Sequence, residues 1–592
     1  MPKRFLILLV LLQAGAALGQ MNMPMADSGD PVPPEQLPAP QHIEGVGNVR
    51  FPITANGKAR MWFEQGYNLL YDFWDYEADR ALEESIRVDA DCAMCYWGLY
   101  QAESFNHSVT KTYAQAALQK AVALEAHATP REKLYIQAAE AHEAAIRDAG
   151  SADPKFDHEL EILRTLVKEN PSDTNARIAL SEAVNDGYDD AGEPRQGKKE
   201  QLALLQGVLK EEPQNSAANH LWIHAVEAGP HPEQALHSAE ILGSLAPASG
   251  HMVHMPGHIF FRTGDYAHAQ TSFDASAQTD EGYMRAQHIA PDNDWNYVHN
   301  LMYSIANLLE AGQMQEAGQV SAKLAKARGH LEDTLYPWSP RDAIARLNPE
   351  LPAALRTADW PRVVQLVNAA NLSQNMPHME FLAGGLSQFA LGMQSVEGHE
   401  PDVAERHSVL LDSTLWRMSQ QIKDQEAKDK KTGPPTGNQS MSPDPLPKPL
   451  LQMLSIMSLE LRGSMLATQD NVPEAEKLFA AARREEKELG YHEPPFYIRP
   501  EAESEAAAMM TAGKWADAEA ALQKALVDRP NSGFALYGLA QVEEKKGNSG
   551  ATTTSYRQFL TAWKTADPGL PEVQHAQQWV RQHDGVGNSG SY

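Results

Sequence analysis

Apolar positions in this chain recur with the spacing of amphipathic helices through most of residues 51–580. Apolar residues fall at i, i+3, i+4 and i+7, and the alternation that predicts strands is rare. Ala, Leu, Glu, Gln and Lys are abundant, while Pro, Gly and Asn interrupt the pattern at short intervals. The pattern therefore predicts an all-α fold made of short, antiparallel helix pairs.

Residues 1–19 have a different pattern. Lys3 and Arg4 precede an apolar run from Phe5 to Leu18, and small residues follow it. This order is typical of a secretory signal peptide, here with cleavage before Gln20. Its short, Leu-rich form indicates export to a bacterial periplasm or the medium. No other stretch approaches twenty apolar residues, so we expect no membrane span after cleavage.

Further breaks in the helical pattern divide the rest of the chain. A Pro-rich segment predicts a disordered leader, and a charged, then Pro/Gly/Ser-rich segment predicts a linker or long loop. The predicted organisation is a signal peptide at 1–19, a leader at 20–50, a helical array at 51–421, the linker at 422–448, a second array at 449–580 and a flexible tail at 581–592.

The helix pairs share a repeat period. Gly513 and Gly547 lie about 34 residues apart, as do Pro213 and Pro247, and this interval is typical of helical repeats. In the segment TGDYAHAQTSFDASA, a turn glycine precedes an aromatic, a small and a bulky residue: Gly264, Tyr266, Ala269 and Phe273. This pattern resembles the tetratricopeptide repeat. The resemblance covers most of residues 51–570 and implies a right-handed solenoid whose concave groove is lined by the first helix of each repeat.

Several longer motifs resemble a narrower group of proteins. CAMCYWG, HLWIHAVEAG, HMVHMPGHIFFRTGDY, YVHN and EPPFY are similar to segments of exported bacterial tetratricopeptide proteins that have no assigned activity. The resemblance therefore implies a fold and a location, and it leaves the reaction open.

Histidine is concentrated in the middle of the chain. Ten of the 22 histidines lie between His220 and His299. His254 follows His220 at the repeat interval, and His258 follows His224 at the same interval. A His-x-x-x-His pair thus recurs with the repeat, and residues four apart share one face of a helix.

The repeat register predicts where these side chains point. With Pro213 near the end of one repeat, the resemblance implies that a set of seven residues faces the groove: His220, His224, Glu227, His251, His254, His258 and His299. Met252 and Met255 fall off this stripe, so we expect them in the core. Pro256 bends the same helix by removing an N–H group.

Two functions fit such a stripe. The groove histidines are suited to gripping a protein or peptide partner. Alternatively, His220, His224, His254 and His258 hold a divalent transition metal such as Zn, Cu or Fe, because neutral imidazole is a ligand for these ions. Glu227 would then serve as a ligand, as a partner of a ligand or as a catalytic general base. This second hypothesis makes the protein a hydrolase or an oxidoreductase.

The net charge and the cysteine content restrict the kinds of partner and of redox role that the protein can have. The net charge of −28 argues against nucleic acid, because phosphate binding requires an excess of Lys and Arg. The chain has two cysteines, Cys92 and Cys95. They form either a pair of buried thiols or a disulfide, and the absence of a strand–turn–helix context argues against a thioredoxin-type role.

Overall fold

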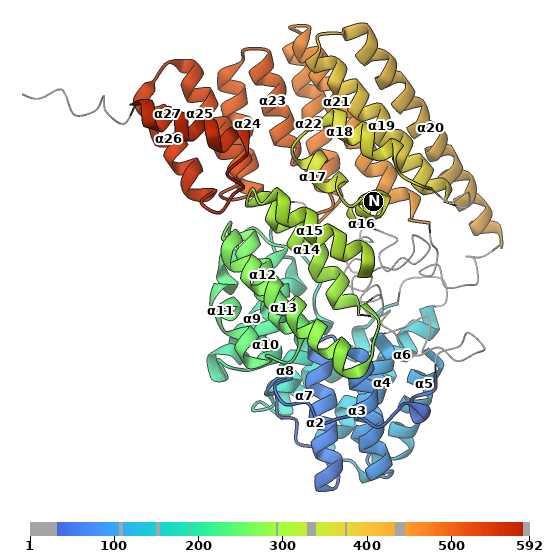
Figure 1. Cartoon of the computed structure of the whole chain (residues 1–592). Coiled ribbons are helices and arrows are strands. Elements are labelled where there is room, and N and C mark those ends of the chain that lie inside the picture. Colours follow the sequence, from blue (N-terminus) through green and yellow to red (C-terminus); the bar gives the residue numbers. More distant parts are fainter. Residues whose placement is uncertain are drawn as a thin grey trace, which may run out of the picture. The chain divides into compact units, whose positions relative to one another are not determined.

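The protein is built from α-helices (Figure 1). The computed structural model describes residues 32–105, 111–149, 154–189, 191–291, 294–327, 339–372, 376–432 and 444–583. Within these ranges there is no strand, and a bridge between Tyr188 and Pro194 is isolated. The predicted all-α fold of paired helices is confirmed. The predicted signal peptide at 1–19 lies outside the described residues.

The chain forms two compact units, Met1–Phe260 with Thr271–Tyr297, and Phe261–Gln270 with Val298–Tyr592. Consecutive helices of the first unit pack against each other in pairs. The elements up to residue 287 are η1 (Pro34–Gln36), α2 (Gly57–Tyr71), α3 (Asp75–Val88), α4 (Ala93–Phe105), α5 (Lys111–Ala123), η2 (Glu125–His127), α6 (Pro130–Ala149), α7 (Asp157–Glu169), α8 (Thr174–Ala183), α9 (Gln196–Glu211), α10 (Ser216–Glu227), η3 (Pro232–Ala235), α11 (Leu236–Leu245), α12 (Gly250–Arg262) and α13 (Tyr266–Gln287).

The second unit continues the same construction, and its helices also pack against their neighbours in the chain. The remaining elements are α14 (Trp295–Glu310), α15 (Met314–Ala327), α16 (Pro340–Leu347), α17 (Leu351–Arg356), α18 (Trp360–Asn368), α19 (Pro377–Glu397), α20 (Pro401–Thr432), α21 (Pro447–Thr468), α22 (Val472–Glu488), α23 (Glu501–Thr511), α24 (Trp515–Asp528), α25 (Gly533–Lys546), α26 (Ser549–Ala562) and α27 (Pro571–His583).

A glycine facing a bulky side chain sets the close approach of several helix pairs. In α12, a Cβ atom at Gly257 would lie 2.4 Å from Cε1 of Phe273 in α13, closer than carbon atoms can approach. The missing side chain of the glycine therefore makes room for the ring. The same spacing along the chain recurs in two other pairs, Gly66 with Leu82 and Gly463 with Phe479.

The predicted disordered leader at 20–50 is wrong for its second half. Residues 20–31 lie outside the described residues, but the chain that follows is packed against the helices, with Val46 and Val49 buried. The side chain of Asn68 bonds both the N–H and the C=O of Val49. Arg80 donates to two further carbonyls of the leader. Side chains of the helices thus form hydrogen bonds with backbone groups of the leader, which in a disordered segment would bind water.

The predicted linker at 422–448 also differs from the structure. Helix α20 continues to Thr432, because the charged residues there are good helix formers. Helices α19, α20 and α21 share one hydrophobic core that includes Leu382, Leu411 and Leu454. The segment therefore connects helices of a single core. Residues 433–443 lie outside the described residues. Helix α27 extends to His583, so the first residues of the predicted tail at 581–592 are helical, and residues 584–592 lie outside the described residues.

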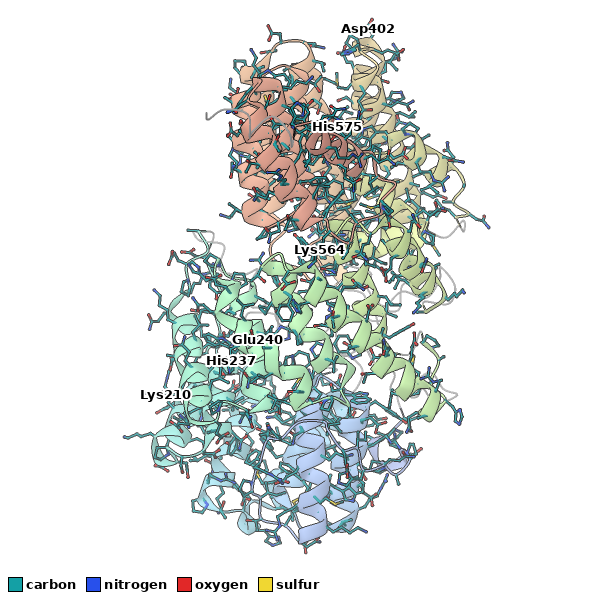
Figure 2. All side chains as sticks on the ribbon, turned by 60° about the vertical axis from the view of Figure 1, so that its left-hand side comes forward. Lys210, His237, Glu240, Asp402, Lys564 and His575 are labelled. Atoms are coloured by element: carbon teal, nitrogen blue, oxygen red, sulfur yellow. A yellow bond between two sulfur atoms is a disulfide. The ribbon has the colours of Figure 1, made fainter. Side chains whose placement is uncertain are left out.

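Apolar side chains of the helix pairs lie in the core, and charged side chains lie mostly at the surface. Met252 and Met255 are fully buried in the core of the first unit, as predicted. Charged and polar side chains such as Lys210, His237 and Glu240 project from its surface (Figure 2). Among the described helices, none combines the length and the apolar character that crossing a membrane requires.

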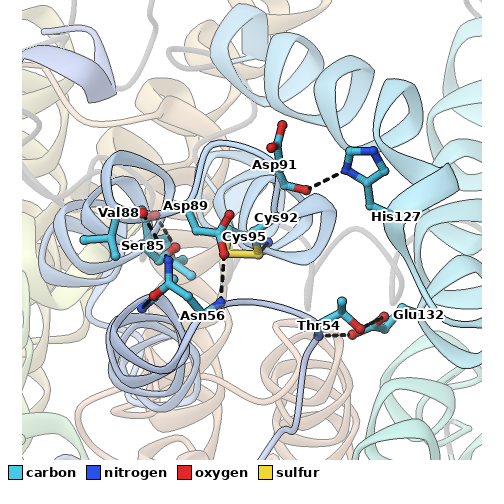
Figure 3. Close-up of a disulfide and its surroundings, with 12 residues drawn as sticks. Thr54, Asn56, Ser85, Val88, Asp89, Asp91, Cys92, Cys95, His127 and Glu132 are labelled. Carbon is cyan, nitrogen blue, oxygen red and sulfur yellow. Dashed lines mark hydrogen bonds between the residues drawn. A yellow bond between two sulfur atoms is a disulfide. The ribbon is translucent and has the colours of Figure 1, made fainter.

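Cys92 and Cys95 form a disulfide at the start of α4 (Figure 3). Both cysteines are buried, and the N–H of Cys95 also lies 3.0 Å from Sγ of Cys92. Nearby, the N–H of Asn56 donates to Asp89, and the Asn56 side chain donates to the carbonyl of Val88. Of the two alternatives open from the sequence, the structure has the disulfide.

We expect Gly257→Ala to lower stability by about 1–3 kcal/mol, because the new methyl group must displace the rigid ring of Phe273. Gly282→Ala is the matched control, since Gly282 is also helical and a methyl group added there would have no atom within 4 Å. The control should be neutral or slightly stabilising. Chemical denaturation of both variants checks this, and equal effects would contradict the packing argument.

We expect alkylation of the unfolded, unreduced protein to modify no cysteine, because both thiols are held in one disulfide. After reduction, both cysteines should react. Mass spectrometry of the alkylated protein distinguishes the two states, and modification before reduction would show free thiols instead.

Candidate metal centre

Helices α10 and α12 carry six of the seven residues predicted to face the groove. The two helices occupy equivalent places in consecutive repeats, since His220 and His254 are separated by one repeat period. The side chain of Asn215 caps α10 by accepting a hydrogen bond from the N–H of Ala218. Five of the six residues are at most 4% exposed, namely His220, Glu227, His251, His254 and His258. The side chain of His224 is 18% exposed.

The ring of His220 is oriented by the end of α2. Its Nδ1 lies 2.6 Å from the carbonyl oxygen of Tyr71. A carbonyl only accepts hydrogen bonds, so Nδ1 carries the proton and Nε2 carries the lone pair. That Nε2 atom lies 3.1 Å from Nε2 of His251. Burial, with a further contribution from His224, holds the pKa of His220 well below its usual value.

His251 is oriented in the same sense by Asn296. The amide nitrogen of Asn296 donates to Asp280 at 2.8 Å, so its oxygen faces His251 and accepts from Nδ1 at 3.2 Å. The proton of His251 is therefore also on Nδ1. The two Nε2 atoms that face each other at 3.1 Å thus both carry lone pairs when the rings are neutral.

His224 completes a group of three. One ligand atom from each of His220, His224 and His251 lies within 4.8 Å of the others. Nδ1 of His224 is 2.6 Å from Oε1 of Glu227, which leaves its Nε2 as the ring atom for the group. These three rings form a group that could hold a metal ion, because neutral imidazole nitrogen is a common ligand of zinc, copper and iron.

Phe73 packs against all three rings, with centroid distances of 4.8, 5.6 and 5.1 Å to His220, His224 and His251. Its backbone φ is 53°, a left-handed conformation that a bulky residue rarely adopts. Such a conformation costs about 1–3 kcal/mol and persists where the surroundings impose it. Nothing in the sequence around Phe73 marks this role, because the residue lies far before the histidines of the group in the chain.

A second pair of rings lies farther along α12. Nε2 of His254 and Nε2 of His258 are 2.6 Å apart. Nδ1 of His258 is 2.8 Å from Oε2 of Glu227. Each oxygen of the Glu227 carboxylate is therefore engaged by a different ring, Oε1 by His224 and Oε2 by His258. This contact assigns Glu227 to orienting two imidazoles.

The structure groups the predicted ligands differently from the sequence. His220 and His224 join His251, while His254 pairs with His258. The reason is distance along the helix: His251 and His258 are seven residues apart, which is about 10 Å at 1.5 Å per residue. One ion cannot bind both ends of α12. His299 belongs to the second unit, where it is buried in α14 with its ring edge-on to Tyr303.

A small cavity adjoins His251. Its volume is about 20 Å³, and its lining includes the carboxylates of Asp72, Asp280 and Asp294. That volume exceeds the roughly 10–15 Å³ that one water molecule needs. Asp280 also explains why residue 250 is a glycine, because a Cβ atom there would lie 1.7 Å from Oδ1 of Asp280.

The carboxylates of the cavity are buried without a Lys or Arg partner among the described residues. Burial raises the pKa of Asp294 to about 6. Burial also raises the pKa values of Asp72 and Asp280 well above their usual range, and the charge of Asp294 adds to the effect on Asp280. The sequence does not indicate these three residues, since single aspartates at distant positions carry no spacing signal.

Comparisons with known proteins add little. No family model matches the sequence, and neither does any curated protein. Yeast Tom70 is similar with a TM-score of 0.29 and 11% identity, over 89% of this chain and 95% of that one. A human IFIT1 dimer with m7Gppp-AAAA has a TM-score of 0.30 and 10% identity, over 94% and 100%. Scores this low carry no argument, and the fold assignment rests on the helix pairs themselves.

We expect Asp75→Asn to raise the melting temperature by a few degrees at about pH 8 and by less at about pH 5. Asp75 begins α3, its carboxylate oxygens have no hydrogen-bond partner among the described residues, and burial raises its pKa from 3.8 to about 7. An acid whose pKa is raised on folding destabilises the protein increasingly as pH rises from its unfolded to its folded pKa. The neutral amide removes this cost.

The exposed Glu240→Gln variant serves as the control for that experiment and should show no such pH dependence. Calorimetry at both pH values checks the difference. An equal shift of Asp75→Asn at both would show that its carboxyl group does not titrate in this range.

Proposed function

We propose that this helical-repeat protein is a metalloenzyme in which His220, His224 and His251 hold a divalent transition-metal ion. The repeat scaffold positions α10 and α12, and these helices supply all three rings. The observation that carries the proposal is the approach of Nε2 of His220 to Nε2 of His251 at 3.1 Å, with both Nδ1 atoms committed to other acceptors.

Two lone pairs at this distance repel unless a cation lies between them. A proton would place a positive charge on a fully buried ring, and desolvation opposes that. A metal ion satisfies both nitrogens at once. Zinc–nitrogen bonds of about 2.0–2.1 Å in a tetrahedron separate neighbouring ligands by about 3.3 Å. The observed separation of 3.1 Å is close to that value.

The hydrogen bonds around the rings also fit metal ligation. Metal-bound histidines commonly donate their other ring nitrogen to a carbonyl or a carboxylate. His220 donates to the carbonyl of Tyr71, and His224 donates to Glu227.

Three protein ligands and a neighbouring water-sized cavity favour a catalytic site over a closed structural one. An ion held by His220, His224 and His251 would supply Lewis-acid activation of water for hydrolysis. Asp294 lines the cavity beside His251, and its raised pKa of about 6 suits it to hold a released proton. We therefore propose hydrolysis as the reaction class. Export of the protein, predicted from residues 1–19, remains a prediction.

We expect the purified protein to retain at least one equivalent of zinc, copper or iron after dialysis. His220→Gln and His251→Gln should each lower that ratio by about one and abolish any chelator-sensitive hydrolase activity, because each removes one of three ligands. His237→Gln removes an exposed histidine, 73% accessible on α11, and is the matched control. Elemental analysis gives the ratios.

The decisive negative result is a wild-type protein that binds none of the three metals after reconstitution. The alternative of a groove that binds a protein or peptide would then be the hypothesis to test, by capture of a partner on the folded protein.

A further inference from the structure

We propose that His254 and His258 bind a second divalent transition-metal ion, so that the centre holds two ions linked by Glu227. This inference rests on the proposed function and extends it. Both histidines lie on α12, four residues apart on one face of the helix, and both are fully buried.

The geometry of the pair points to ligation. The two Nε2 atoms face each other at 2.6 Å, so the two rings present these nitrogens to the same place. Nδ1 of His258 donates to Glu227, which leaves its Nε2 as the acceptor atom. A carboxylate behind a ring in this position is the arrangement that orients histidine ligands in metal sites.

Glu227 connects this pair to the three-histidine site. Its Oε1 atom engages His224 of that site, and its Oε2 atom engages His258 of the pair. Glu227 is 1% exposed, so its negative charge acts at short range and with little screening. One carboxylate thus raises the basicity of a ligand in each site. Removing the carboxylate should weaken the binding of both ions.

The separation along α12 shows why one ion cannot serve all of these rings. His251 lies in the first turn of the helix and His258 in its third, about 10 Å apart along the axis. His220 and His224 gather at the His251 end. The His254–His258 pair is therefore a separate position, and imidazole ligands select the same class of first-row ions as the first site.

The test counts metal in the full chain. Wild-type protein reconstituted with Zn²⁺ and dialysed should hold two equivalents. The double variant His254→Gln/His258→Gln should hold one, and the double control His231→Gln/His237→Gln, which removes two exposed histidines, should hold two. Circular dichroism and the melting temperature establish that each variant is folded.

A wild-type ratio of one, or a ratio of two in the His254/His258 variant, overturns this inference. The remaining variants separate its failure from that of the proposed function. If wild type holds one ion that His220→Gln loses, the three-histidine site stands and the second site fails. If wild type holds none, both proposals fail.

Glu227→Gln tests the link between the sites. The amide is uncharged, so both rings lose a negatively charged acceptor, and one of them also loses its hydrogen bond because the amide has only one accepting atom. We expect the variant to keep the helical fold and to bind both ions about 10–100-fold more weakly in chelator competition. Weakening of only one ion would contradict the shared role of the carboxylate.

Discussion

A buried imidazole ring has two nitrogen atoms that both need a partner, and this requirement organises the centre of the first unit. His220 places one nitrogen on a backbone carbonyl, His251 on an amide, and His258 on a carboxylate. In each case the remaining nitrogen turns toward another ring. These partners belong to the fold, so hydrogen bonds within the protein fix the orientation of the rings.

The repeat architecture makes this arrangement possible. Equivalent helices of consecutive repeats present the same face, and the His-x-x-x-His pairs of α10 and α12 therefore meet. Packing reaches the rings as well. Gly257 leaves room for Phe273, and the ring of Phe273 lies 5.1 Å from that of His254. Phe273 thus has two roles. Its ring packs against Gly257 where α12 and α13 approach each other, and the same ring contacts the ring of His254.

Composition was a poor guide wherever tertiary packing supplies what the local sequence lacks. The leader is rich in proline, yet Asn68 and Arg80 hold its backbone against the helices. The charged segment after Ile422 resembles a linker, yet it continues α20 to Thr432. In both places the composition of the segment misleads because the segment's hydrogen-bonding and hydrophobic partners lie elsewhere in the chain.

The sequence by itself determined the all-α fold, the helix pairs and the register that brings the histidines of α10 and α12 to one face. These features depend on the helical period and the repeat period, and both periods can be recognised within a single stretch of the chain. Only the tertiary structure decided which rings meet. The pairing of His220 with His251, the cover of Phe73 and the carboxylates of Asp72 and Asp280 depend on contacts between elements that are distant in the chain. Such contacts follow from how helices pack in three dimensions, and no spacing along the chain records them.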